Sequence, residues 1–167
     1  IGVNDEMFYT ALKSFKGAAN RLELLNKNYS TSIYKDFAHA PSKVKATTNA
    51  VKKQFDRKNL VAVLELHTFS SLTKDFLSQY NDTLKTVDVP VVFYSPETIE
   101  HKKLEAISES DIKKAFNHKD LTIFTNKEKL SEYLLSLDWN NKNLLFMSSG
   151  TFGGLNLNDL SKQIVED

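Results

Sequence analysis

Three short polar segments contain the residues best suited to chemistry, and each follows an apolar run. They are Asp36-Phe-Ala-His-Ala-Pro41, Glu65-Leu-His-Thr-Phe-Ser-Ser71 and Ser148-Ser-Gly-Thr-Phe-Gly-Gly154. In an open parallel sheet, ligands bind in the crevice beyond the carboxyl ends of the strands. If the apolar runs are parallel strands, the three segments therefore meet at one edge of the sheet.

The first segment places an acid and a histidine between a strand and the start of a helix. Backbone N–H groups and the helix dipole favour an anion at that position. Asp36 could accept two hydrogen bonds from a ribose diol, with His39 beside it. The alternative is that Asp36 only caps the helix and that His39 is an ordinary loop residue.

The second segment offers several side chains that could contact a polar ligand. These are His67, Thr68, Ser70 and Ser71. A histidine that ends a buried strand is more often a structural hydrogen-bonding residue than a catalyst. No Asp-His-Ser spacing in the sequence marks a hydrolase triad.

The third segment combines three glycines with Ser148 and Ser149 directly after an apolar run. Glycine lets the backbone approach a ligand closely and present N–H donors. Gly150 and Phe152 lie within this turn and could contact such a ligand. The pattern is not GxGxxG and lacks the lysine of a P-loop. An ordinary tight turn is an equally good interpretation.

The other polar groups favour solvent-exposed positions. His101 and His118 lie in polar surroundings and are expected at the surface. A basic cluster could bind phosphate, but a solvated helix face is favoured because no aromatic platform is interleaved with it. The cluster consists of Lys43, Lys45, Lys52, Lys53, Arg57 and Lys58.

Five apolar runs predict the strands that carry these segments. Short apolar runs alternate with helix-like stretches after residue 30, which is typical of β/α units and a mostly parallel sheet. Three runs are apolar without alternation, as expected of central strands buried on both faces. The predicted strands are Thr31–Lys35, Leu60–Leu66, Pro90–Tyr94, Leu121–Phe124 and Leu144–Met147, of which the second, third and fifth are the central ones.

A hairpin is predicted before the first parallel strand. Residues 21–25 and 31–34 flank a polar turn, so one antiparallel strand should lie beside the sheet. The expected fold class is α/β: a Rossmann-like three-layer domain with a mostly parallel sheet and an antiparallel hairpin strand near the N-terminus.

Two helices are indicated by clear patterns. Across Pro41–Phe55, apolar residues recur at three- and four-residue spacing, and proline suits the first turn. Thr125 and Glu128 have capping-box spacing ahead of an apolar face. Weaker patterns predict helices at Glu6–Phe15, Leu72–Gln79, Asp111–Phe116 and Asp159–Val165.

Bulk properties limit the class of protein. The 167 residues, 41% hydrophobic and 26% charged, suit one soluble domain with a real core. The absence of cysteine excludes disulfides and cysteine zinc sites, which fits the cytoplasm. A net charge of +1 gives no support for nucleic acid as a partner, and no apolar run is long enough for a membrane span. Helix-like sequence begins at once after Ile1, so we expect a piece of a longer polypeptide.

Four motifs in order resemble the third domain of the Mur ligases, across nearly the whole chain 1–167. Phe15-Lys-Gly-Ala-Ala-Asn-Arg-Leu-Glu23 precedes the three segments, and Asp36-Phe-Ala-His looks like the family's motif after the first strand of that domain. Phe146-Met-Ser-Ser-Gly-Thr-Phe-Gly-Gly154 looks closest to the murein peptide ligases, the recycling branch of the family.

The resemblance implies a reaction. ATP phosphorylates a carboxylate on UDP-N-acetylmuramate or its peptide, and the amine of an incoming amino acid or peptide attacks the acyl phosphate. The product serves peptidoglycan synthesis or recycling, and through them cell shape and division. The expected partners are these substrates and the enzyme's own upstream ATPase domain. A UDP-binding domain is also absent from this chain, so the fragment is expected to be inactive alone.

The resemblance also implies roles for individual residues. Arg21 would approach the ATP phosphates, Asp36 would hold the ribose, and His39 would line the join between phosphate and incoming amine. The remaining substrate-contact positions are Phe37, His67, Thr68, Ser71, Ser148, Ser149, Gly150 and Phe152.

Some positions depart from the family pattern. Relatives that add a single alanine carry two arginines in the second loop, where this chain has Thr68 and Ser71, which disfavours alanine as the incoming group. Lys35 stands where many relatives have an acid.

ATP and Mg²⁺ would be held mainly by the absent central domain. The chain has no GxxxxGK[ST] motif and no carboxylate set for Mg²⁺, so no metal ligand is assigned. Micromolar ATP binding requires about −8 kcal/mol, whereas a helix amino terminus contributes ~1 kcal/mol or less. The alternative to a ligase domain is a non-catalytic flavodoxin-like or receiver-like α/β binding module.

Overall fold

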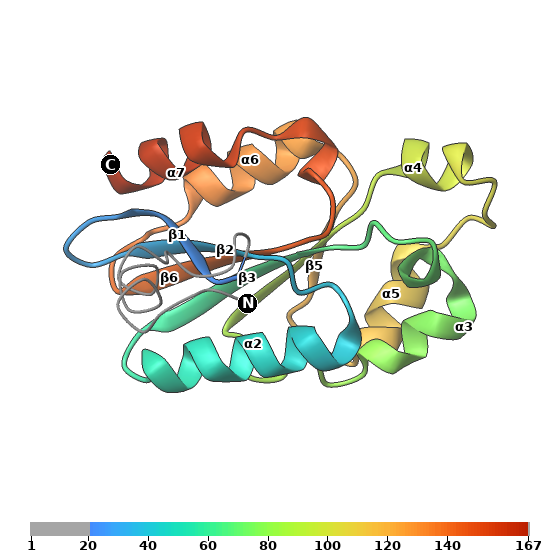
Figure 1. Cartoon of the computed structure of the whole chain (residues 1–167), viewed down its shortest axis with the longest axis horizontal. Helices are drawn as coiled ribbons and strands as arrows, with labels where there is room; N and C mark the ends of the chain where they lie inside the picture. The colour runs from blue at the N-terminus through green and yellow to red at the C-terminus, as the bar shows by residue number, and fades with distance from the viewer. Residues whose placement is uncertain (1–20, 167) are drawn as a thin grey trace, which may run out of the picture.

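Six strands form one sheet, in the order β1-β2-β6-β3-β4-β5, in a computed structural model that describes residues 21–166 (Figure 1). All neighbouring strands pair in parallel except β1 and β2, which form the antiparallel hairpin. The predicted fold class is therefore confirmed. The strands are β1 Glu23–Lys27, β2 Ser32–Asp36, β3 Asn59–Glu65, β4 Val89–Phe93, β5 Thr122–Phe124 and β6 Lys142–Met147.

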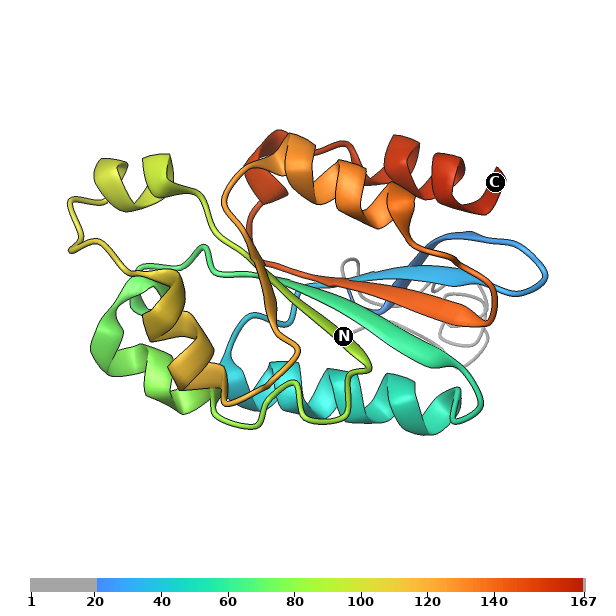
Figure 2. The same ribbon diagram turned by 180° about the vertical axis from the view of Figure 1, so that it is seen from behind.

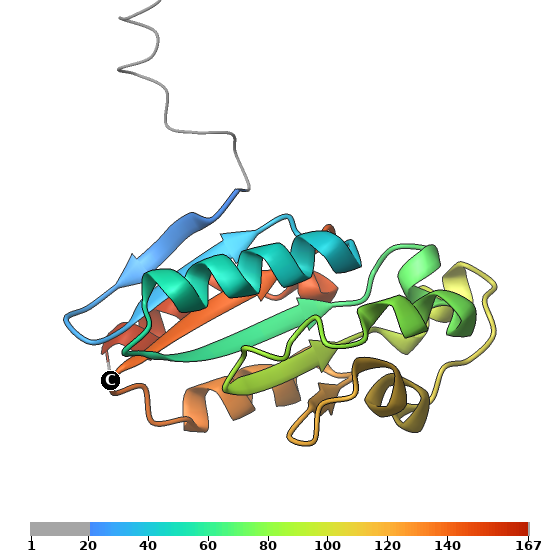
Figure 3. The same cartoon turned by 90° about the horizontal axis from the view of Figure 1, so that it is seen from below.

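Helices cover both faces of the sheet (Figures 1 and 2). Figure 3, seen from below, shows α2 lying along one face. On that side lie α2 Pro41–Gln54, α3 Lys74–Leu77 and α5 Glu109–Phe116. On the other lie α6 Lys127–Ser136 and α7 Leu157–Glu166. The remaining helical segments are α4 Pro96–His101 and the 3₁₀ turns η1 Ser70–Leu72, η2 Ser78–Tyr80 and η3 Phe152–Gly154.

The central strands are apolar without alternation because each packs into two cores. In β3, Ala62 and Leu64 face the core under α2, whereas Val61 and Val63 face the core under α6 and α7. β6 divides its residues in the same way. Side chains of a strand point alternately to opposite faces, so both sets must be apolar when both faces are covered. The prediction that β3, β4 and β6 are central is confirmed.

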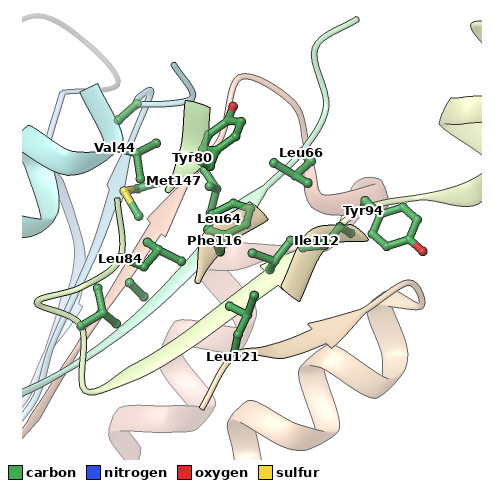
Figure 4. Close-up of a cluster of buried hydrophobic side chains, with 14 of the residues drawn as sticks. Val44, Leu64, Leu66, Tyr80, Leu84, Tyr94, Ile112, Phe116, Leu121 and Met147 are labelled. Atoms are coloured by element: carbon green, nitrogen blue, oxygen red, sulfur yellow. The ribbon is translucent and has the colours of Figure 1, made fainter. Parts of the chain in front are cut away.

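The core beneath α2, α3 and α5 contains aromatic residues that reach toward the carboxyl ends of the strands. Figure 4 shows Tyr80 and Phe116 within it. Their rings stack with centroids 5.0 Å apart. The Tyr80 hydroxyl donates a 2.6 Å hydrogen bond to the backbone carbonyl of His39, which ties this core to the loop after β2.

Two helix predictions need correction. The capping box at Thr125 and Glu128 is wrong: Asn126 is the N-cap, and its side chain accepts from Lys129 N at 2.8 Å. The helix predicted at Leu72–Gln79 is broken because Thr73 is extended, with φ −110° and ψ 141°.

One helix was not predicted and one lies outside the described residues. Helix α4 escaped prediction although Ser95 caps it and Pro96 occupies its first turn. The predicted helix Glu6–Phe15 falls outside residues 21–166. Within the described residues, no helix is both long and apolar enough to cross a membrane.

Candidate functional site

The carboxyl ends of β2, β6 and β3 lie side by side, so the three polar segments meet at one edge of the sheet. Met147 is the register partner of Asp36 on one side and of Leu64 on the other. Just beyond the strands, the Ser148 backbone N–H donates a 3.1 Å hydrogen bond to the carbonyl of Asp36. The edge predicted from the strand pattern is therefore formed.

Asp36 is fixed by the backbone on two sides. Its Oδ2 accepts from Leu22 N and its Oδ1 from Ala38 N, each at 2.7 Å. The N-cap of α2 is Ala40, and no side chain caps that helix. The interpretation of Asp36 as a helix cap is therefore wrong. A carboxylate has about four lone-pair sites, so both oxygens can accept further hydrogen bonds from a ligand.

A cavity of about 360 Å³ opens beside Asp36. This volume is within the usual range for small-molecule sites, roughly 300–1,000 Å³. Arg21 and Lys43 bring two cationic groups to it. Lys43 lies in the first turn of α2 and is exposed, as the prediction of a solvated helix face expects, and it also lines the cavity. The lining residues are Arg21, Asp36, Phe37, Ala38, His39, Lys43 and Thr47.

His39 is held in the cavity wall by local contacts. Its Nδ1 lies 2.9 Å from the carbonyl oxygen of Phe37, and its ring meets the half-exposed Phe37 ring edge to face at 5.2 Å. Burial raises the pKa of Tyr80 to about 12. The Tyr80 phenol therefore stays protonated at neutral pH and donates to the His39 carbonyl. This bond anchors the loop that carries the histidine.

Glu65 is the site residue that sequence reasoning missed. It ends β3 with 3% exposure, and its Oε2 accepts from the Ser148 hydroxyl and, at 3.0 Å, from Phe152 N. Its Oε1 lies 3.8 Å from His67 Nδ1. The available signal was an acid at the end of an otherwise apolar buried strand, since a buried charge requires partners.

Three N–H groups of the glycine-containing turn after β6 donate to acceptors within the protein, as an ordinary tight turn would, and contact of this turn with a ligand stays a prediction. Gly150 N–H donates to Ser148 Oγ at 2.6 Å, and Phe152 N–H donates to Glu65. Gly154 N–H donates to the Thr151 carbonyl at 3.0 Å. The buried carboxylate of Glu65 accounts for the direction of the Phe152 N–H, because a buried charge needs hydrogen-bond donors.

The other residues of the second and third segments differ in accessibility. Phe152 is 1% exposed and packs against Phe93 and Phe146, so its ring belongs to the core. The Ser71 side chain is buried and accepts a 2.9 Å hydrogen bond from Thr68 Oγ1.

Two polar side chains of these segments, those of Ser149 and His67, make no hydrogen bond to the residues that the structure describes. Ser149 Oγ is buried without a partner within residues 21–166. His67 keeps 39% of its side chain exposed and makes no hydrogen bond through its ring among the described residues.

The two other histidines, His101 and His118, and the hollow between α3 and α5 lie outside the three polar segments. His101 is exposed as predicted, whereas His118 is half-buried, and its Nδ1 lies 3.3 Å from Asp120 N. A larger hollow of about 470 Å³ lies between α3 and α5, but none of the predicted site residues lines it. No group of three potential metal ligands occurs in the part of the chain that the structure describes.

Comparisons of the sequence with known families and proteins all match Mur ligases. The family described as "Mur ligase, glutamate ligase domain" matches residues 20–150. UDP-N-acetylmuramate–L-alanine ligase of Hydrogenobaculum sp. (strain Y04AAS1) is 28% identical over 143 residues, covering 86% of this chain and 31% of that protein. The corresponding ligase of Agathobacter rectalis is 30% identical over 152 residues, covering 90% and 32%. The chain thus spans about a third of the length of these relatives.

Solved structures share the fold at low sequence identity. A murein peptide ligase from Psychrobacter arcticus superposes with a TM-score of 0.67 and 19% identity, over 100% of this chain and 34% of that one. UDP-N-acetylmuramate-alanine ligase from Thermotoga maritima gives 0.64 and 16%, over 99% and 33%. Folylpolyglutamate synthase from Thermotoga maritima gives 0.55 and 18%, over 97% and 37%.

Proposed function

Because this chain belongs to the Mur ligase family, through its glutamate ligase domain, we propose that it is the carboxy-terminal domain of a longer ATP-dependent amide ligase. The chain spans only about a third of the ligases that it resembles, and it contains no P-loop sequence. The triphosphate cradle and the UDP-binding surface would therefore come from other domains. The flavodoxin-like or receiver-like alternative has no support from these relatives.

The proposed reaction forms an amide in two steps. The γ-phosphoryl group of ATP passes to a carboxylate oxygen of UDP-N-acetylmuramate, which yields ADP and an acyl phosphate. The amine of the incoming amino acid or peptide then attacks the acyl carbon, and inorganic phosphate leaves as the amide forms. Mg²⁺ would neutralise phosphate charge during transfer, and the central domain would bind it. The cytoplasm is the proposed location, because nucleotide precursors are made there.

The cavity beside Asp36 is the single observation that best supports a nucleotide half-site. Arg21 and Lys43 bring positive charge to one wall, and the fixed carboxylate of Asp36 can accept hydrogen bonds from a ribose diol. His39 lines the same cavity, where we place the phosphate and incoming amine. The exposed edge of Phe37 adds an apolar contact.

The second and third segments are proposed to bind the incoming substrate. His67, Thr68 and Gly150 are partly exposed, whereas the role of Ser148 is to hold the loop. Ser149 contributes through its backbone, and Phe152 and Ser71 act from buried positions.

Thr68 and Ser71 bond each other and offer no positive charge to clamp the carboxylate of a single amino acid. We therefore favour a peptide as the incoming group, which points to recycling. L-alanine is the alternative, because it is named in the sequence relatives.

The test is an ADP-release assay on the full-length ligase with ATP and UDP-N-acetylmuramate. The incoming group is either L-alanine or the tripeptide L-alanyl-γ-D-glutamyl-meso-diaminopimelate. We expect ADP release to depend on the added amine and to be faster with the tripeptide. Faster turnover with L-alanine would overturn the peptide assignment, and no amine-dependent ADP release with either compound would overturn the ligase function.

A further inference from the structure

Glu65 is the only charged side chain that is buried within residues 21–166. It stands at the carboxyl end of β3, where the sheet edge carries the candidate site. A carboxylate removed from water is stable only when donors or positive charge replace the lost solvent. The groups that surround Glu65 therefore indicate what it does.

Two of those groups belong to the loop after β6. The Ser148 hydroxyl and the Phe152 N–H both donate to Glu65 Oε2. Ser148 Oγ in turn accepts from Gly150 N–H at 2.6 Å. One carboxylate thus closes the turn from residue 148 to residue 152 onto the end of a strand that lies more than eighty positions earlier in the chain.

The third group is His67, two residues after Glu65. Its Nδ1 lies 3.8 Å from Glu65 Oε1, so it faces the carboxylate but is too far away for a direct hydrogen bond. Gly150 packs directly against the imidazole: a Cβ there would lie 2.6 Å from His67 Cγ and 2.8 Å from Glu65 Oε2. Gly150 therefore lies against both the His67 ring and the Glu65 carboxylate, and 39% of the His67 side chain is open to solvent.

We propose that Glu65 is a positioning residue for the amine-binding side of the site. Its carboxylate holds the 148–152 loop and orients His67 so that Nδ1 faces Glu65 and Nε2 is left for the substrate. Neutral His67 then takes a proton at Nε2 from the ammonium group of the incoming amine. The inference rests on the proposed ligase function, because only that reaction needs a free amine.

Each proton that leaves the amine in this step has an acceptor. The substrate R–NH₃⁺ becomes R–NH₂, and His67 becomes an imidazolium whose Nδ1–H faces the Glu65 carboxylate. The amine forms a bond to the acyl carbon, the bond from that carbon to the phosphate oxygen breaks, and the new nitrogen loses its extra proton to solvent.

Hydrogen exchange in the full-length ligase tests the positioning of the loop. Glu65→Ala removes the acceptor for Phe152 N–H, so exchange of the amides at 148–152 should accelerate by about tenfold or more. Glu65→Gln keeps an acceptor oxygen and should change exchange less. Glu132→Gln, at an exposed position on α6, is the matched control and should have no effect. Unchanged exchange at 148–152 in Glu65→Ala would overturn the inference.

Kinetics test the effect on the incoming amine. In Glu65→Gln, kcat should fall about tenfold or more while the KM for ATP stays within about twofold, because the nucleotide cavity is untouched. His67→Gln should lower kcat similarly, and the double variant should be little worse than either single variant. The inference would be overturned if kcat were unchanged in Glu65→Gln, or if the KM for ATP rose as much as kcat fell. It would also be overturned if the kcat losses of the two single variants added up in the double variant. A wild-type enzyme without amine-dependent ADP release would instead reject the ligase function, and the exchange experiment would still report on the loop.

Discussion

The phenol of Tyr80 connects the hydrophobic core to the loop that carries His39. Its ring stacks on Phe116, whereas its hydroxyl leaves the core to meet a backbone carbonyl. A residue deep in the core therefore determines where a candidate catalytic loop lies. The sequence suggests the burial of this aromatic residue but not its long-range partner, which is 41 positions away.

Replacing Tyr80 by phenylalanine should lower the free energy of unfolding by about 1 kcal/mol, because the ring is kept and one hydrogen bond is lost. Burial raises the folded pKa of Tyr80 from 10.0 to about 12, so this contribution is complete below pH 10 and is lost as pH rises toward 12. Urea denaturation at neutral and alkaline pH measures it. Tyr29→Phe, at a fully exposed position, is the control and should show no change.

Gly150 lies where no side chain fits. Gly150→Ala should destabilise the fold by about 1–3 kcal/mol, because the new methyl group would collide with His67 and Glu65. Ser149→Ala is the neighbouring control and should be nearly neutral, since its buried hydroxyl has no partner within residues 21–166. Equal thermal stability of Gly150→Ala and wild type would contradict the close packing of the loop.

Single residues explain much of what sequence reasoning missed. Glu65 is bound by Ser148 and Phe152, which lie 83 and 87 positions away, and no local pattern encodes such pairings. The sequence predicts Asp36 as an acid at the end of a strand, and it is the last residue of β2, but its bonds to Leu22 and Ala38 depend on the folded path of the chain.

Among the elements, α5 has the most complete amino-terminal cap. The Ser108 side chain accepts from Asp111 N at 3.1 Å, and the Asp111 carboxylate accepts from Ser108 N at 2.9 Å. These hydrogen bonds, from the Ser108 backbone first, lower the pKa of Asp111 below its usual 3.8. The helix packs against α3, close to the larger hollow.

Ser108→Ala and Asp111→Asn should both destabilise the protein at neutral pH, because each removes half of the reciprocal cap. A lowered folded pKa means that the Asp111 contribution is present above 3.8 and is lost as pH falls through the lower folded value. Thermal melts of wild type and Asp111→Asn should therefore converge well below pH 3.8. A gap that stays constant with pH would argue against the carboxylate cap.

Long elements were more predictable than short ones. The three central strands were identified because covering both faces forces a continuous apolar run, and α2 because its apolar stripe spans four turns. Short elements depend on single caps, and a neighbouring residue can take the role, as Asn126 does in place of Thr125. Helix α4 has only six residues, too few for a periodic pattern.

At the scale of the whole molecule, parallel pairing gathers the chemistry at one edge. The strand order β2-β6-β3 brings the first, third and second polar segments together although they lie far apart in sequence. The cavity beside Asp36 is lined by the first of these segments together with Arg21, Lys43 and Thr47, and the sequence contains no P-loop motif. The isolated chain should therefore bind ATP more weakly than about 1 mM, as a cavity with two cations and one helix start supplies too little free energy. Calorimetric titration of the chain with ATP measures this affinity, and micromolar binding would contradict a half-site.

The most direct measurement is the ATP dependence of Asp36→Ala in the full-length ligase. We expect the KM for ATP to rise about tenfold or more with little change in the KM for the incoming amine, because a hydrogen-bonding carboxylate is lost from the nucleotide side. Asp56→Ala, an exposed acid beyond the end of α2, should behave as wild type, and thermal melts should verify that both variants fold. Normal turnover of folded Asp36→Ala with unchanged ATP dependence would contradict the account.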